Sequence, residues 1–191
     1  MPADSSFEIY KSRVQSIQHK LALELGSFIP AAVLIPFYEK NGEPFLLFAK
    51  RTQTVRHHKG QISFPGGAYE LTDPDLRHTA LRETEEEIGL DQSRVEILAE
   101  LDDMFTPTRF RVTPFVGVIP YPYSFKINPH ETAELIEVPL RHLLLESHHR
   151  TGYRMYQSRI YEIHYYDFGE HTIWGVTGQI LNDLLKKIQQ P

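Results

Sequence analysis

The chain has 191 residues, of which 41% are hydrophobic and 24% are charged, and its formal net charge is −5 at pH 7. These values are ordinary for a globular protein and exclude a chain that is disordered throughout. The acidic balance gives no general attraction to nucleic acid, and the absence of cysteine excludes disulfides and cysteine nucleophiles. We expect a single domain over residues 1–191, with its core over about residues 30–187.

The sequence has no apolar stretch of the length that crosses a membrane, about 18 residues or more. Residues 1–20 contain carboxylates and lack the apolar segment that a signal peptide needs. We therefore expect a cytoplasmic protein with neither a membrane partner nor a nucleic-acid partner. The sequence leaves a homodimer open.

The first predicted element is an amphipathic helix over Phe7–Leu25, which makes residues 1–28 an N-terminal helical extension. Two apolar β-type runs follow, Ala31–Tyr38 and Pro44–Ala49. Between them lies Asn41-Gly42, and Asn-Gly between such runs is a hairpin signal. We expect two antiparallel strands here.

Residues 51–67 are basic, polar and contain glycine, which predicts a loop. The next segment, Asp75–Ile88, combines apolar residues at helical spacing with many acids, and Gly89 supplies a helix stop signal. Asp73 is the candidate N-cap, with Pro74 in the first turn.

Beyond this helix we expect three short strands, a short helix, one or two further strands and a closing helix. Their predicted ranges are Val95–Leu101, Val112–Ile119, Glu134–Val138, Leu140–Leu145, Met155–Tyr166 and Trp174–Ile188. The order of elements predicts an α+β fold, an α/β/α sandwich with a mixed central sheet.

The acidic helix is the most informative segment. Glu83, Glu86 and Glu87 stand at positions i, i+3 and i+4, so their carboxylates share one helix face. Each like-charged pair costs an isolated helix roughly 0.2–0.5 kcal/mol. A hard divalent cation such as Mg²⁺ would offset this repulsion. The alternative is an exposed acidic face paired with Arg77 and Arg82, and the spacing alone does not decide between them.

Two neighbouring segments favour the cation, one before the helix and the other, Gly89-Leu90, at its end. Phe64-Pro65-Gly66-Gly67 precedes the helix, and paired glycines let the backbone approach a ligand or donate a carbonyl to a metal. With this segment, Arg82–Leu90 resembles the Nudix box, except that Thr84 takes a usually aliphatic position. The first half of the box carries one extra residue, and Asp73 stands near the place of the leading glutamate.

The resemblance implies a pyrophosphohydrolase in which water attacks phosphorus directly. Glu83 and Glu87 would be the principal ligands of Mg²⁺ or Mn²⁺, and Glu86 would be a third ligand or would orient the water. Arg82 would hold these glutamates in place by ion pairing. The backbone carbonyl of Gly67, or of the glycine before it, would add a ligand.

A second resemblance narrows the substrate. Nudix enzymes that act on coenzyme A share a motif ahead of the box, and the residues that match it here are Leu47, Arg51, Arg56, Gly60 and Phe64-Pro65-Gly66-Gly67. This implies a small nucleotide substrate, coenzyme A or a derivative, cleaved to 3′,5′-ADP and 4′-phosphopantetheine or its acyl form. Arg51 and Arg56 would bind the phosphates, as would the backbone at Gly66 and Gly67, whereas salt bridges are the structural alternative for both arginines.

Several alternatives stay open. The chain could hydrolyse another nucleotide, such as ADP-ribose or a nucleoside triphosphate, or it could be a non-catalytic nucleotide-binding Nudix module. Glu131 and Glu134 are either candidate general bases or solvated strand-edge acids. The aromatic residues that either stack adenine or belong to the core are Tyr121, Tyr123, Phe125, Tyr153, Tyr156 and Trp174.

Overall fold

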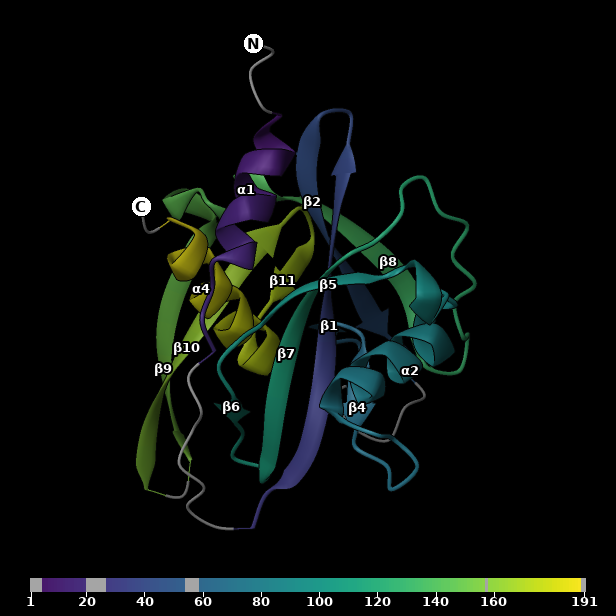
Figure 1. The fold of residues 1–191 in the computed structure, drawn as a ribbon. Helices are drawn as coiled ribbons and strands as arrows, with labels where there is room; N and C mark the ends of the chain where they lie inside the picture. Colours follow the sequence, from purple (N-terminus) through teal and green to yellow (C-terminus); the bar gives the residue numbers. More distant parts are fainter. Residues whose placement is uncertain (1–4, 20–26, 54–58, 157, 190–191) are drawn as a thin grey trace.

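The computed structural model describes residues 5–19, 27–53, 59–156 and 158–189. Figure 1 shows how its helices and strands are arranged. In chain order the elements are α1 (Ser6–Gln15), β1 (Ile29–Lys40), β2 (Glu43–Arg51), β3 (Ile62–Ser63), β4 (Gly66–Ala68), α2 (Leu76–Ile88), η1 (Gln92–Arg94), β5 (Glu96–Glu100), β6 (Met104–Phe105), β7 (Phe110–Val118), β8 (Thr132–Pro139), α3 (Leu140–Leu143), η2 (Glu146–His148), β9 (His149–Tyr156), β10 (Arg159–Phe168), β11 (His171–Ile173) and α4 (Gly175–Gln189).

A mixed sheet forms the middle of the molecule. Within the described residues it has eight strands in the order β3-β2-β1-β7-β5, with β4, β6 and β8 pairing with β1, β7 and β2. β1 and β7 run parallel over Ile29–Phe37 and Phe110–Val118, whereas the other pairs are antiparallel. Helix α2 lies on one face, and α1 and α4 lie on the other (Figure 1). The predicted α+β fold with a mixed sheet is confirmed.

The remaining strands, β9, β10 and β11, form a separate antiparallel sheet in the described chain. Helix α4 packs against β10, where the carbonyl oxygen of His164 would lie 2.4 Å from a Cβ placed on Gly178. Only glycine allows this close approach of helix and strand. The small sheet is thereby fixed beside the central one.

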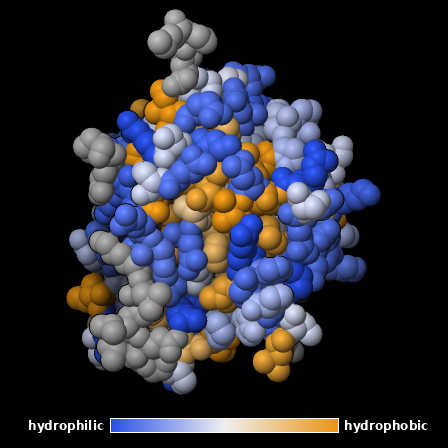
Figure 2. All heavy atoms as spheres, in the orientation of Figure 1, coloured by the Kyte–Doolittle hydropathy of each residue, from blue (hydrophilic) through white to orange (hydrophobic). Residues whose placement is uncertain are grey.

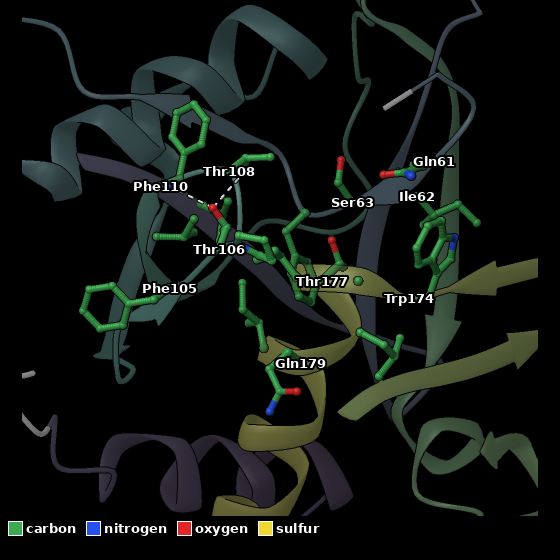
Figure 3. Close-up of a pocket in the computed structure, with 18 of the residues that line it drawn as sticks. Gln61, Ile62, Ser63, Phe105, Thr106, Thr108, Phe110, Trp174, Thr177 and Gln179 are labelled. Atoms are coloured by element: carbon green, nitrogen blue, oxygen red, sulfur yellow. Dashed lines mark hydrogen bonds between the residues drawn. The ribbon is translucent and has the colours of Figure 1, made fainter. Parts of the chain in front are cut away.

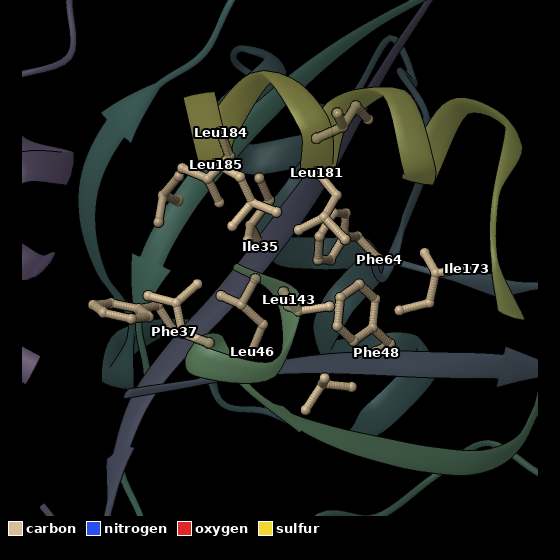
Figure 4. Packing of buried hydrophobic residues seen from close by; sticks show 14 of the residues in the cluster. Ile35, Phe37, Leu46, Phe48, Phe64, Leu143, Ile173, Leu181, Leu184 and Leu185 are labelled. Atoms are coloured by element: carbon tan, nitrogen blue, oxygen red, sulfur yellow. The ribbon is translucent and has the colours of Figure 1, made fainter. Parts of the chain in front are cut away.

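Hydrophobic side chains fill both faces of the central sheet. The larger cluster lies between the sheet and α1, α3 and α4 (Figure 4), where Phe48 and Phe64 stack with their ring centroids 4.6 Å apart. The smaller cluster lies under α2 and includes Ala80 and Ile88. The surface in Figure 2 is mostly hydrophilic, with hydrophobic residues gathered near its middle. No helix among the described residues is long and apolar enough to cross a membrane.

The predicted hairpin at Asn41-Gly42 is confirmed. Both residues have positive φ, 55° and 79°, and the strands pair directly beside them, Lys40 with Glu43. Positive φ at both central residues is what a type I′ turn requires, and Asn and Gly tolerate it best.

The predicted helix over Phe7–Leu25 is too long. Helix α1 ends at Gln15, and the Ser16 hydroxyl donates a 2.7 Å hydrogen bond to the carbonyl oxygen of Arg13. A serine side chain that satisfies a terminal carbonyl competes with continuation of the helix. The predicted apolar positions 21 and 25 lie outside the described residues.

Candidate active site

The acidic helix α2 begins and ends at short-range signals. Asp75 is its N-cap, since the carboxylate accepts a 2.8 Å hydrogen bond from the backbone N–H of His78. The prediction that Asp73 caps this helix is wrong, because Asp75 stands directly before the first helical residue and Asp73 is buried two residues earlier. At the other end, Gly89 adopts the left-handed conformation with φ 69°, which confirms the predicted stop.

Asp73 instead binds Arg82. The guanidinium donates from Nε and Nη2 to the two carboxylate oxygens of Asp73 at 2.9 and 3.0 Å, and the hydroxyl of Thr79 donates a third hydrogen bond at 2.9 Å. These bonds, that of Arg82 foremost, lower the pKa of Asp73 to about 2. From the same guanidinium, Nη1 lies 2.9 Å from Glu83 and 3.3 Å from Glu86. Arg82 therefore links the loop before α2 to the carboxylates on its face.

Glu87 is the most buried of the three glutamates, with 5% of its surface exposed. It accepts a 3.3 Å hydrogen bond from the backbone N–H of Gly66 and lies 3.4 Å from Nη1 of Arg51. Burial is the main cause that raises the pKa of Glu87 to about 7; the negative charges of Glu83 and Glu131 contribute to this rise, and Arg51 and the N–H of Gly66 oppose it. The pKa of Glu83 is also raised, chiefly by burial. The carboxylates of Glu83 and Glu87 thus lie close together at a site where water solvates their charged forms poorly.

The two glycines let these carboxylates approach the backbone of β4. A Cβ placed on Gly67 would lie 2.5 Å from the carboxyl carbon of Glu83. Gly66 has a φ of 152°, and a Cβ there would lie 2.3 Å from the carbonyl oxygen of Ala32 on β1. Neither position accepts a side chain without displacement of its neighbours.

The other predicted site residues differ in how directly they contact Glu83 and Glu87. The side chain of Glu86 is 56% exposed and reaches the group through Arg82. Glu131 lies close enough to act electrostatically on Glu83 and Glu87, whereas Glu134 pairs with a lysine at 3.3 Å. Arg56 lies outside the described residues. The sequence does not distinguish the two downstream glutamates, because only the tertiary fold separates their surroundings.

The donor set suits a hard divalent cation. Carboxylate oxygens are the ligands that Mg²⁺ and Mn²⁺ prefer, and the crowded negative charge at Glu83 and Glu87 would be offset by such an ion. No three Asp, Glu or His side chains in the described part of the chain form a ready metal site. Because Mg²⁺ keeps several waters and takes ligands from substrate phosphates, two carboxylates are a sufficient protein contribution.

A cavity of about 480 Å³ opens beside this centre (Figure 3). Its lining runs from Arg51 and Gly66 at the carboxylates to Tyr161 on the small sheet and Trp174 directly after β11. Thr177 and Gln179 of α4 also contribute to the lining (Figure 3). The volume is within the range of about 300–1,000 Å³ that is typical of small-molecule sites, and most of the lining is apolar or aromatic.

Comparison with known proteins agrees with this geometry. The model of the NUDIX domain matches residues 28–158. The relative described as "Uncharacterized Nudix hydrolase NudL" from Photorhabdus laumondii is 39% identical over 162 residues, which are 83% of this chain and 84% of the relative. A relative with the same description from Enterobacter sp. (strain 638) is 32% identical over 185 residues, which are 97% of this chain and 96% of the relative.

Two solved structures share the fold. A Caenorhabditis elegans Ap4A hydrolase binary complex superposes with a TM-score of 0.51 at 18% identity, covering 58% of this chain and 80% of that one. A MutT/nudix family protein from Enterococcus faecalis superposes with a TM-score of 0.55 at 14% identity, covering 89% and 65%. The match to the domain model, the curated relatives and the carboxylate-bearing helix lead to one conclusion: the chain belongs to the Nudix hydrolase family, whose members hydrolyse pyrophosphate bonds.

Proposed function

We propose that this protein is a Mg²⁺- or Mn²⁺-dependent pyrophosphohydrolase of coenzyme A or its derivatives, releasing 3′,5′-ADP and 4′-phosphopantetheine or its acyl form. The observation that carries the proposal is the placement of Glu83 and Glu87 against the backbone of Gly66 and Gly67, at one end of a cavity that also contains Arg51. Two carboxylates, an accessible backbone and the guanidinium of Arg51 thus lie where we propose that a diphosphate binds.

The proposed metal ligands are the carboxylates of Glu83 and Glu87 and the backbone carbonyl of Gly67, with Glu86 at the exposed side. Nudix hydrolases generally use divalent cations. When bound, the cation would supply charge neutralisation for the diphosphate and acidify an attacking water. Arg82 would keep Glu83 oriented through its 2.9 Å contact.

Two further side chains have proposed roles in the same reaction. Arg51 pairs with Glu87 only at 3.4 Å, so its guanidinium can turn to a phosphate oxygen once a cation neutralises that carboxylate. Glu131, whose charge acts on Glu83 and Glu87, is our candidate to accept the proton of the attacking water.

The coenzyme A assignment is supported by where the residues of the upstream motif lie. Leu47 is buried in β2 and Phe64 is buried against its neighbour Phe48, so both fix the framework of the site. Arg51 and Gly66 line the cavity directly. Among the described residues of the motif, Arg51 and Gly66 therefore lie at the end of the cavity where we propose that the diphosphate binds.

The first experiment compares substrates. Purified protein is incubated with Mg²⁺ or Mn²⁺ and coenzyme A, with ADP-ribose and Ap4A as parallel substrates, and products are separated by chromatography. We expect 3′,5′-ADP from coenzyme A with a kcat/KM clearly above that of the other two. Cleavage of only the other compounds would refute the substrate assignment, and cleavage of none would contradict the proposed hydrolase.

The second experiment tests the carboxylates. Glu83→Gln and Glu87→Gln should each lower kcat by on the order of 10²-fold or more, the scale of losing one electrostatic group in an active site. The matched control is Glu85→Gln on the same helix, since the side chain of Glu85 is exposed and, in the described chain, accepts a hydrogen bond only from Gln92, at 2.7 Å. Full activity in both test variants would exclude these residues as metal ligands.

A further inference from the structure

An arginine on the small sheet lies beside two aromatic residues of the cavity lining. The guanidinium carbon of Arg154 lies 5.1 Å from the ring centroid of Trp174, and Arg154 pairs across the strands with Tyr161. Both aromatic residues line the cavity. The charge of Arg154 is therefore held beside the end of the cavity that is away from the carboxylates.

No ion pair in the described part of the chain neutralises this charge. Within the described residues Arg154 makes no ion pair, although its side chain is held over an aromatic ring. Arg150 on the same strand differs, since it binds Asp167 at 3.0 Å and stacks on Tyr165 at 4.2 Å. An exposed guanidinium that is positioned by a ring but has no counter-ion is suited to bind an external anion.

Glu162, the acid that lines the cavity in the described part of the chain, does not oppose this role. Glu162 pairs across the strands with Tyr153, whereas Arg154 pairs with the adjacent Tyr161. Successive residues of a strand point to opposite faces, so Glu162 and Arg154 lie on different faces of the hairpin. The region around Arg154 keeps its positive character.

We propose that Arg154 binds the 3′-phosphate of a 3′-phosphorylated adenine nucleotide, whose base lies against Trp174 and Tyr161. The inference rests on the proposed function for the position of the diphosphate, at Arg51 and Gly66. Flat aromatic faces suit adenine, and a guanidinium fork matches the oxygens of a phosphate. The cavity then binds the nucleoside half of coenzyme A. Arg154 gives coenzyme A an advantage over nucleotides that lack a 3′-phosphate.

The test compares coenzyme A with 3′-dephospho-coenzyme A, which lacks only this phosphate. For the wild type we expect kcat/KM to be higher with coenzyme A by roughly 10- to 100-fold, the scale of a hydrogen bond to a charged group. Arg154→Gln should remove this preference, mainly through KM, and leave the rate with the dephospho compound unchanged. Arg150→Gln, the control on the same face of β9, should keep it.

Binding provides a second readout that needs no turnover. Calorimetry should show tighter binding of 3′,5′-ADP than of 5′-AMP to the wild type, and equal binding to Arg154→Gln. An equal loss with both compounds, or a preserved preference in the variant, would overturn the inference. If neither coenzyme is cleaved but the binding preference follows Arg154, the proposed function fails and the 3′-phosphate site stands.

Discussion

At the scale of single residues, the site is organised by Arg82, which binds Asp73 through two nitrogens and the glutamate Glu83 through the third. The spacing of Glu83, Glu86 and Glu87 was sufficient to predict their shared face. It did not predict that Glu86 is exposed while Glu87 is buried, because burial is determined by the approach of β4.

The Asp73 carboxylate should make stability depend on pH in the acid range. Its folded-state pKa of about 2 is below the ordinary value of 3.8, so the unfolded chain binds the proton more readily. The stabilisation, on the order of 2 kcal/mol, is fully present above about pH 4 and is lost as the pH falls through about 2.

Urea unfolding between pH 6 and pH 2.5 measures this effect. Asp73→Asn should be less stable than the wild type at pH 6, and the difference in free energy of unfolding should shrink as the pH falls. A difference that stays constant over this range would show that the ion pair with Arg82 does not account for the shift.

At the scale of elements, local signals predicted what local interactions determine. Asn41-Gly42 predicted its hairpin and Gly89 predicted the end of α2, because both depend on positive φ at one or two residues. Strands β3 and β4 have two and three residues, too few for an alternating pattern to be detected, and they exist through pairing with β2 and β1. Arg154 had no sequence signal, since its role depends on where β9 places it.

The hairpin of β9 and β10 contains a histidine pair that should also respond to pH. Nε2 of His149 lies 2.9 Å from Nδ1 of His164, so one nitrogen must donate and the other accept. Burial lowers the pKa of both rings; the neighbouring charge of Lys186 on α4 lowers it further, and Glu162 opposes this. His149 also stacks on Tyr166, whose pKa is raised by burial to about 12 and which stays neutral here.

Because the folded-state pKa values lie below 6.5, the neutral pair stabilises the fold fully above pH 6.5. This contribution is lost as the pH falls from 6.5 through the lowered values, since protonation of both rings replaces the hydrogen bond by repulsion. Thermal unfolding at pH 7.5 and pH 5 should show a decrease for the wild type that is smaller in His149→Gln. An equal decrease in both proteins would contradict the assignment.

At the scale of the whole molecule, the fold gathers negatively charged side chains on the face of α2 that packs against β4 of the central sheet. The general Nudix architecture was predictable from two motifs, whereas the cavity was not, because its walls come from β3, β7, β10 and α4, which are distant in the sequence. Glu83 and Glu87 are raised in pKa mainly by burial, so their ionised forms are costly to the native state without a bound cation.

A divalent cation that binds the native site should therefore stabilise the whole fold. At a metal concentration 100 times its Kd, native-state binding adds about 2.7 kcal/mol, and for a chain of this size each kcal/mol raises Tm by about 2–4 °C. We expect millimolar Mg²⁺ or Mn²⁺ to raise the wild-type Tm by several degrees and Glu85→Gln to respond equally. The Glu83→Gln, Glu87→Gln double variant should have a higher Tm than the wild type without metal, because two buried charges are removed, and should show no shift with it. An undiminished shift in the double variant would place the cation elsewhere in the protein.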